Sequence, residues 1–283
     1  NQIVSSRLYQ GVIYLVTRTI INKITPCPMP LTLGPNSISI PCIDIYRPNY
    51  PISVDSTFTV LTIDPKNGVV KNKVSFVGSA NLSVVYMSPN AIYITYTQFT
   101  EITKIFYDFF DAKGKDLLPG EILGKLKKLE GYDISLSAKF TELQVILESY
   151  YGSLNSDERL RIENEVANRL SDYVKERARE LEKTGIVKVE VKDLTIKATG
   201  EVPGRPLNQF SLDEYQEYLR VATTTSGGLF GGRESVNDVY ILDSNLTRMA
   251  AVTDLGKGER IYAVRFIEDK GYVVTFREID PFY

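Results

Sequence analysis

Acidic side chains are the groups in this sequence from which a catalytic site could be built. Histidine is absent from all 283 residues, which excludes Ser-His-Asp and Cys-His nucleophile systems together with the commonest zinc sites. The candidate functional surface consists of Asp213, Glu214, Glu259, Arg260 and Asp280. Two carboxylates across a channel mouth could cleave glycosidic bonds. Turns at Asp213-Glu214 and Asp280, with a Glu259-Arg260 ion pair between sheets, explain the same residues structurally, so we expect no catalysis.

Metal, cofactor and nucleic-acid sites are not expected from the sequence. The region from Asp238 to Asp243 is too sparse in oxygen ligands for a calcium loop, and no stretch has EF-hand spacing. The glycine-rich segment 227–232 lacks the Lys-Ser/Thr of a phosphate loop and reads as a flexible connection. A net charge of −2 and a pI near 5.5 provide no basic surface for a nucleic acid.

Two cysteines, Cys27 and Cys42, lie in one proline-rich excursion between strands. A disulfide would clamp this loop and stabilise the fold by about 3 kcal/mol. Such a bond persists in oxidising compartments, so the pattern favours an extracellular or cell-surface location. The alternative is a pair of unpaired, buried thiols. The sequons at Asn81 and Asn245 permit glycosylation.

The ends of the chain and its hydropathy add two expectations. No run of eighteen apolar residues occurs, so no transmembrane segment is expected in this chain. The first residue is Asn1 rather than Met, and no signal-peptide pattern precedes it. We therefore expect either a processed product or a piece of a longer polypeptide.

Short β-branched and aromatic runs bounded by Gly, Asp and Asn predict antiparallel hairpins along most of the chain. The strand after each first turn is similar in four places, which aligns the tyrosines Tyr14, Tyr93, Tyr218 and Tyr272. Without its loops the unit is about 45 to 50 residues long, as in four-stranded propeller blades. The sequence therefore predicts a mainly β chain forming about three and a half blades. A β-sandwich of unrelated hairpins is the alternative.

A helical insertion interrupts the second of these units. Apolar residues recur at helical spacing in four segments between about 102 and 183, enough for a small antiparallel bundle. We divide the chain into residues 1–101, the helical insertion 102–184, and residues 185–283. Charges of alternating sign in 172–180 are typical of a solvated helix face, although the long helix could also contact a protein partner.

Several motifs resemble a known family. They are residues 207–215 (LNQFSLDEY), 219–224 (LRVATT), 258–266 (GERIYAVRF) and 271–277 (GYVVTFR). These closely resemble the secreted β-propeller domain family of archaea and bacteria, which is described as distantly related to WD40 repeats. The resemblance implies a propeller fold, an extracellular or surface-attached protein, no associated reaction, and a longer chain with further blades.

These observations favour an exported or cell-surface scaffold that binds another macromolecule. Because three and a half blades cannot close a ring, we expect the rest of a longer polypeptide or a second chain to complete it. Two other functions remain open. One is a carboxylate-dependent hydrolase of polysaccharide or peptide, and the other is a filament subunit joined by strand addition.

Overall fold

The computed structural model describes residues 1–33, 36–47, 54–226 and 235–277. The chain forms two compact units. The strand unit comprises Asn1–Gln98, Lys183–Thr224 and Val236–Tyr283, and the helical unit comprises Phe99–Glu182 and Thr225–Ser235.

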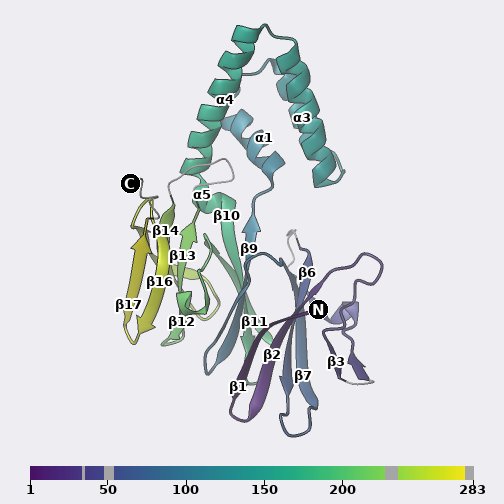
Figure 1. Cartoon of the computed structure of the whole chain (residues 1–283), viewed down its shortest axis with the longest axis vertical. Helices are drawn as coiled ribbons and strands as arrows, with labels where there is room; N and C mark the ends of the chain where they lie inside the picture. The colour runs from purple at the N-terminus through teal and green to yellow at the C-terminus, as the bar shows by residue number, and fades with distance from the viewer. Residues whose placement is uncertain (34–35, 48–53, 227–234, 278–283) are drawn as a thin grey trace, which may run out of the picture. The chain divides into compact units, whose positions relative to one another are not determined.

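Four sheets, numbered here in chain order, and one small hairpin make up the described part of the strand unit (Figure 1). Sheet 1 has the order β1-β2-β6-β7-β5, where β5 adds a short parallel edge and the other strands are antiparallel. Its strands are β1 (Gln2–Tyr9), β2 (Val12–Ile20), β6 (Ser56–Ile63), β7 (Val70–Gly78) and β5 (Ile45–Tyr46).

Sheets 2 and 3 each contain four strands. Sheet 2 comprises β8 (Val84–Met87), β9 (Ala91–Phe99), β10 (Glu182–Glu190) and β11 (Ile196–Pro203). Sheet 3 comprises β12 (Leu212–Tyr215), β13 (Tyr218–Thr225), β14 (Val236–Leu242) and β15 (Arg248–Leu255). Sheet 4 pairs β16 (Arg260–Ile267) with β17 (Lys270–Phe276), and a small hairpin pairs β3 (Leu31–Leu33) with β4 (Asn36–Ile38).

Consecutive sheets pack face to face through three separate apolar cores. Between sheets 1 and 2, Phe58 and Phe76 meet Ile94 and Val189. The cores between sheets 2 and 3 and between sheets 3 and 4 are smaller and include, respectively, Tyr93 with Tyr240 and Ala222 with Val264. A sandwich would share one core between two layers, whereas successive sheet-on-sheet cores are the packing of propeller blades. The fold is therefore mainly β, a partial propeller with a helical insertion, as the sequence predicts.

The register of sheet 3 corrects two details of the sequence analysis. Asp213 and Glu214 do not form a turn: they lie within β12, and Tyr215 pairs with Tyr218 across a two-residue turn. The turn residues Gln216 and Glu217 have φ of 50° and 68°, the left-handed geometry that two-residue hairpins require. The short hairpin strands predicted by the sequence are preceded here by a 3-10 helix, η2 (Gln209–Ser211).

Because that turn fixes the register, Tyr218 is not equivalent to the other three aligned tyrosines. In each of the other three hairpins, the second strand begins at the residue that pairs across the turn. Tyr14, Tyr93 and Tyr272 each lie two residues after that first residue. In sheet 3 that position is occupied by Arg220. The tyrosine alignment is therefore wrong by two residues in this one hairpin.

The helical unit is a small bundle with its own core. Its helices are α1 (Ile102–Ala112), α2 (Gly120–Glu130), α3 (Leu136–Gly152), α4 (Ser156–Glu176) and the short α5 (Ala178–Leu181). Phe109, Leu129, Leu143 and Leu170 meet in the core, and α1 lies between α3 and α4 in Figure 1. Asn155 caps α4 by accepting a hydrogen bond from the backbone N–H of Glu158 at 2.9 Å.

Two further features concern the cysteine loop and the membrane. Cys27 and Cys42 form a disulfide with a Cα–Cα distance of 4.9 Å, and η1 (Cys42–Asp44) begins at the second cysteine. The backbone N–H of Ile40 donates to the carbonyl of Pro28 at 3.0 Å within the clamped loop. No helix among the described residues is long and apolar enough to cross a membrane.

Candidate ligand-binding site on the inner strands

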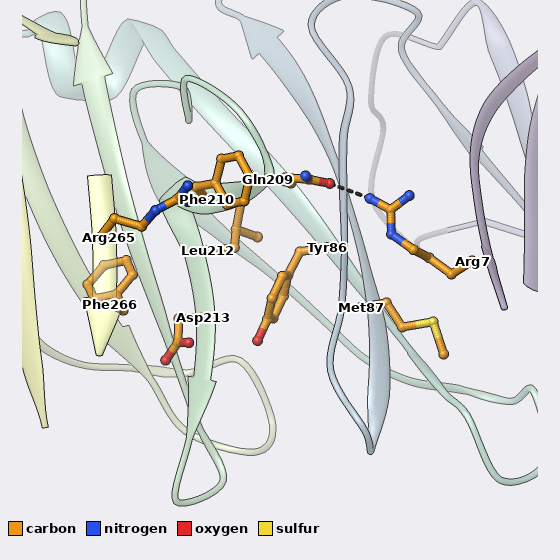
Figure 2. Close-up of a pocket in the computed structure, with 9 residues that line it drawn as sticks. All are labelled: Arg7, Tyr86, Met87, Gln209, Phe210, Leu212, Asp213, Arg265 and Phe266. Carbon is orange, nitrogen blue, oxygen red and sulfur yellow. Dashed lines mark hydrogen bonds between the residues drawn. The ribbon is translucent and has the colours of Figure 1, made fainter. Parts of the chain in front are cut away.

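A pocket of about 250 Å³ lies where the first strands of the four sheets meet, and we call it the axial pocket (Figure 2). Strands β1, β8, β12 and β16 each contribute to its lining, and η2 contributes the remainder. Its lining residues are Arg7, Tyr86, Met87, Gln209, Phe210, Leu212, Asp213, Arg265 and Phe266. Since every sheet presents its first strand here, this is the inner edge of the partial propeller.

The pocket is built from equivalent positions of the four hairpins. In each hairpin we count cross-strand residue pairs outward from the turn. In the third pair, the residue of the first strand lines the pocket, and its partner lies on the second strand. These pairs are Arg7 with Tyr14, Tyr86 with Tyr93, Asp213 with Arg220, and Arg265 with Tyr272. Residues at the same register position of a repeated unit occupy equivalent places, so the repeat brings four side chains of three chemical types to one site.

The 3-10 helix η2 brings two more side chains to this site. The Asn208 side chain accepts a hydrogen bond from the backbone N–H of Phe210 at 2.9 Å, and the Ser211 hydroxyl accepts from the backbone N–H of Leu207 at 3.2 Å. This cap fixes the turn that carries Gln209 and Phe210. Figure 2 shows the amide of Gln209 accepting a hydrogen bond from the guanidinium of Arg7, which links sheet 1 to the start of sheet 3.

The charged groups of the pocket differ in how far they are neutralised. Asp213 forms an ion pair with Arg220 at 2.5 Å, and the Arg220 guanidinium lies 4.9 Å from the ring centre of Tyr215 and 4.8 Å from that of Phe266. Arg265 lies over the ring of Phe210, 3.7 Å from its centre (Figure 2). The carboxylate of Asp213 therefore has a cationic partner, whereas Arg265 contacts an aromatic face.

Glu214, the neighbour of Asp213, joins sheets 2 and 3. Its carboxylate accepts hydrogen bonds from the Tyr93 hydroxyl at 3.1 Å, from Asn90 Nδ2 at 3.0 Å and from the Ser88 hydroxyl. Its backbone N–H donates to the Tyr86 hydroxyl at 3.0 Å. This set of donors and acceptors ties the first turn of sheet 2 to β12, which makes Glu214 a structural residue.

Two phenols beside Glu214 are held in the protonated form. Burial is the main cause that raises the pKa of Tyr93, and the nearby Glu214 carboxylate raises it further. Burial also raises the pKa of Tyr86, although the hydrogen bond from the Glu214 backbone opposes this shift. Neither hydroxyl is therefore suited to act as a base near neutral pH.

Among the described candidate acids, Asp213 alone lines the pocket. Asp213 and Glu214 are successive residues of one strand, so their side chains leave opposite faces of the sheet. Glu259 lies outside the pocket lining and accepts a hydrogen bond from the Thr275 hydroxyl. Arg260 begins β16, pairs with Phe276 and is exposed. Asp280 lies outside the described residues.

The remaining sequence candidates lie away from the pocket or beyond the described part of the chain. Asn81 and Asn245 are exposed, and their glycosylation stays a prediction. The glycine-rich segment 227–232 lies outside the described residues. Within the described ranges, no group of three or more Cys, Asp or Glu residues could hold a metal ion.

Sequence reasoning missed most of the pocket. Of its nine lining residues, it named only Asp213 as a candidate, and it passed over Arg7, Tyr86 and Arg265. The sequence nevertheless contains a signal for the pocket. The third residue before each two-residue turn is a lining residue, one per hairpin. The alignment of Tyr218 with the other three tyrosines, which is wrong by two residues, hides this position in sheet 3.

Comparisons with known proteins identify the family. A model of the family described as "Beta propeller domain" matches residues 1–283. A protein of Archaeoglobus fulgidus described as uncharacterised is 47% identical over 281 residues, covering 99% of this chain and 44% of that protein. An uncharacterised protein of Methanocaldococcus jannaschii is 38% identical over 282 residues, covering 98% of this chain and 44% of its own length. The chain thus spans less than half the length of these relatives. It belongs to the beta propeller domain family.

Proposed function

We propose that this propeller is an exported or cell-surface scaffold that binds another macromolecule without transforming it, and that part of the partner enters the axial pocket. The observation that carries the proposal is the convergence of four equivalent hairpin positions on one pocket. Propellers present the ends and inner edges of their blades as binding surfaces. Asp213 and Glu214 are engaged in an ion pair between strands and in hydrogen bonds between sheets, which fits binding better than hydrolysis.

The disulfide supports the exported location. Cys27 and Cys42 are paired, and bonds of this kind persist in oxidising compartments. Cell fractionation combined with alkylation of free thiols tests the proposal. We expect the protein in the envelope or extracellular fraction with both cysteines protected. Recovery from the cytosol with both thiols alkylated would overturn the location.

Binding through the pocket has a separate test. The purified chain is mixed with envelope preparations from the source organism, and the retained fraction is measured for Gln209→Ala and Phe210→Ala. We expect both substitutions to lower retention. Met249→Ala is the matched control, because Met249 is exposed on β15, the last strand of sheet 3 in its pairing order. Equal retention of all three variants would contradict a binding role for the pocket.

Sheet 4 supports a second element of the proposal, the completion of the ring by further strands. It has two strands in the described part of the chain, whereas each of the other three sheets has at least four. The β17 side chains on the face away from its core, Tyr272, Val274 and Phe276, are more than half exposed. A row of exposed apolar groups on an open sheet is a surface that another sheet or strand would cover.

Either further blades of one polypeptide or a second copy could cover this face. The length of the relatives favours the first source, since each is more than twice as long as the matched region. Sedimentation velocity over a range of concentrations tests the idea on the 283-residue chain. We expect self-association driven by this face. A compact, stable monomer at high concentration would count against it, whereas long polymers seen by electron microscopy would favour the filament alternative.

The helical unit remains a proposed contact surface for a protein partner. Its longest helix, α4, carries alternating charges on the side away from the Ile162, Val166 and Leu170 stripe. Charge reversal on that side, for example Asp172→Lys with Glu176→Lys, should weaken partner binding without altering the helical content. Unchanged binding would exclude this face.

A further inference from the structure

We infer that the axial pocket, which both Arg7 and Arg265 line, takes an organic carboxylate. This inference rests on the proposed binding role and names the ligand class. Three observations carry it: the balance of charge in the pocket, the geometry of the two arginines, and the apolar groups around them.

The charge of the pocket is positive once its internal ion pair is taken into account. Asp213 is the one carboxylate among the described residues that line the pocket, and it is neutralised by Arg220, which is not itself part of the lining. Arg7 donates to two neutral acceptors, the carbonyl of Ser6 at 2.8 Å and the amide of Gln209. Neither Arg7 nor Arg265 forms an ion pair with a carboxylate of the described residues. Two positive charges are therefore left facing one cavity, which favours an anion.

The arginines present hydrogen-bond donors in a form that suits carboxylates. A guanidinium has five N–H donors in a planar fork, and it binds a carboxylate through two parallel hydrogen bonds. The contact of Arg265 with Phe210 uses one face of the guanidinium and leaves the N–H edge available. Gln209 holds the end of Arg7, so this side chain loses less freedom when a ligand binds.

The rest of the lining favours an organic ligand over a bare inorganic anion. Met87, Leu212 and Phe266 offer apolar surface beside the charged groups. A cavity of about 250 Å³ holds a ligand of roughly eight non-hydrogen atoms, if each takes the share of about 30 Å³ that a water molecule occupies in the liquid. A small carboxylic acid and an acidic side chain of a partner protein both present this chemistry.

Calorimetric titration of the full chain with matched probes tests the inference. The probes are phenylacetate, its neutral counterpart phenylacetamide, succinate, inorganic phosphate, and a short glutamate peptide with its glutamine version. We expect phenylacetate to bind at least tenfold more tightly than phenylacetamide, because one charge-assisted hydrogen bond contributes about that factor. Tighter binding of the glutamate peptide than of the free acids would identify an acidic side chain as the natural source.

Substitutions of the two arginines test whether carboxylate binding depends on them. Arg7→Gln and Arg265→Gln should each weaken carboxylate binding about tenfold, and Arg265→Lys should restore part of it, because lysine keeps the charge but not the planar fork. Arg260→Gln is the matched control, because Arg260 lies on the same strand as Arg265, is exposed and does not line the pocket. Equal binding of the acid and the amide, or equal loss in the Arg260 control, would overturn the inference.

The outcomes also separate this inference from the binding role on which it rests. If phosphate binds through both arginines and carboxylates do not, the carboxylate assignment is wrong. If no anion binds while Gln209→Ala still lowers envelope retention, the ligand class is wrong and the binding role stands. If the pocket variants leave retention unchanged, the binding role itself fails.

Discussion

Asp213 and Arg220 face each other across β12 and β13 and form an ion pair at 2.5 Å, at the register position where the other three first hairpins carry a tyrosine on the second strand. The Arg220 side chain is only 11% exposed and lies between two aromatic rings. A cation so far removed from water depends on its carboxylate partner. Sheet 3 thus has an ion pair at the position where sheet 2 stacks Tyr86 on Tyr93, and one member of the ion pair, Asp213, lines the axial pocket.

Substitution of Asp213 should therefore destabilise the fold more than a surface change does. Asp213→Asn leaves Arg220 without its counter-charge, and we expect the free energy of unfolding to fall by roughly 3 kcal/mol. Urea denaturation measures this loss. Asp269→Asn, in the exposed turn of sheet 4, is the control and should change stability by less than about 0.5 kcal/mol. Similar small changes in both variants would show that the pair is dispensable.

Gly200 tests how closely sheets 2 and 3 pack. A Cβ added at Gly200 on β11 would lie 2.5 Å from the carbonyl oxygen and 2.6 Å from the Cβ of Leu246, in the turn of sheet 3. Backbone atoms cannot move aside as a flexible side chain can, so Gly200→Ala should destabilise by about 2 kcal/mol. Gly124→Ala, in α2 with open space around it, should be neutral or stabilising by up to about 1 kcal/mol. Thermal unfolding compares the two, and a tolerated Gly200→Ala would contradict the close packing.

Stability should decline at alkaline pH because of the phenols beside Glu214. Below the ordinary tyrosine pKa of 10.0, Tyr93 is protonated in both the folded and the unfolded state, and its contribution is constant. Above that pH the unfolded chain releases this proton while the folded chain, with its raised pKa, retains it. The free energy of unfolding therefore falls as pH rises, by up to roughly 1.4 kcal/mol per pH unit for this group.

Urea denaturation between pH 8 and 11.5 gives this slope, and Tyr93→Phe should make it shallower. Tyr262→Phe is the control, since this ring is 73% exposed. A slope that is the same in the wild type and in Tyr93→Phe would show that the buried phenol does not resist ionisation.

The disulfide should stabilise the fold by closing a loop, and the effect grows with the logarithm of the loop length. The bond joins residues 15 apart in sequence, and the chain-entropy model gives about 3 kcal/mol for a loop of this length. We expect the double variant Cys27→Ser, Cys42→Ser to lose this amount in guanidinium denaturation. Reductant should lower the wild type to the same midpoint and leave the variant unchanged. An unchanged wild-type midpoint under reducing conditions would contradict the prediction.

Local patterns in the sequence predicted most of the fold. The hairpin β16–β17 and the apolar stripe of α1, with Ile105 and Phe109, depend on neighbours within a few residues, where periodicity is informative. The sequence indicates a turn at Asp213 and Glu214 because aspartate is common in turns. Their stabilising partners, Arg220 and Tyr93, are apparent only once the sheets are paired and stacked.

The site could be predicted much less well than the fold. Arg7 and Arg265 lie near opposite ends of the chain, and no local pattern relates them. Gln209 reaches Arg7 because η2 interrupts an otherwise extended segment, a local choice set by the Asn208 cap. These residues come together only when the blades stack. Predicting the site from the sequence therefore requires the register of all four hairpins.

The central claim is that the first strands of successive sheets meet at one inner edge, and the three methionines allow a direct measurement of it. Because both native cysteines are disulfide-bonded, a nitroxide can be attached selectively to Gln209→Cys in a chain with labelled methionine methyl groups. Met87 lines the axial pocket with position 209, whereas Met249 lies on β15, at the other edge of sheet 3 from β12. We predict that the nitroxide broadens the methyl resonance of Met87 much more strongly than that of Met249. Equal broadening, or stronger broadening of Met249, would contradict the arrangement.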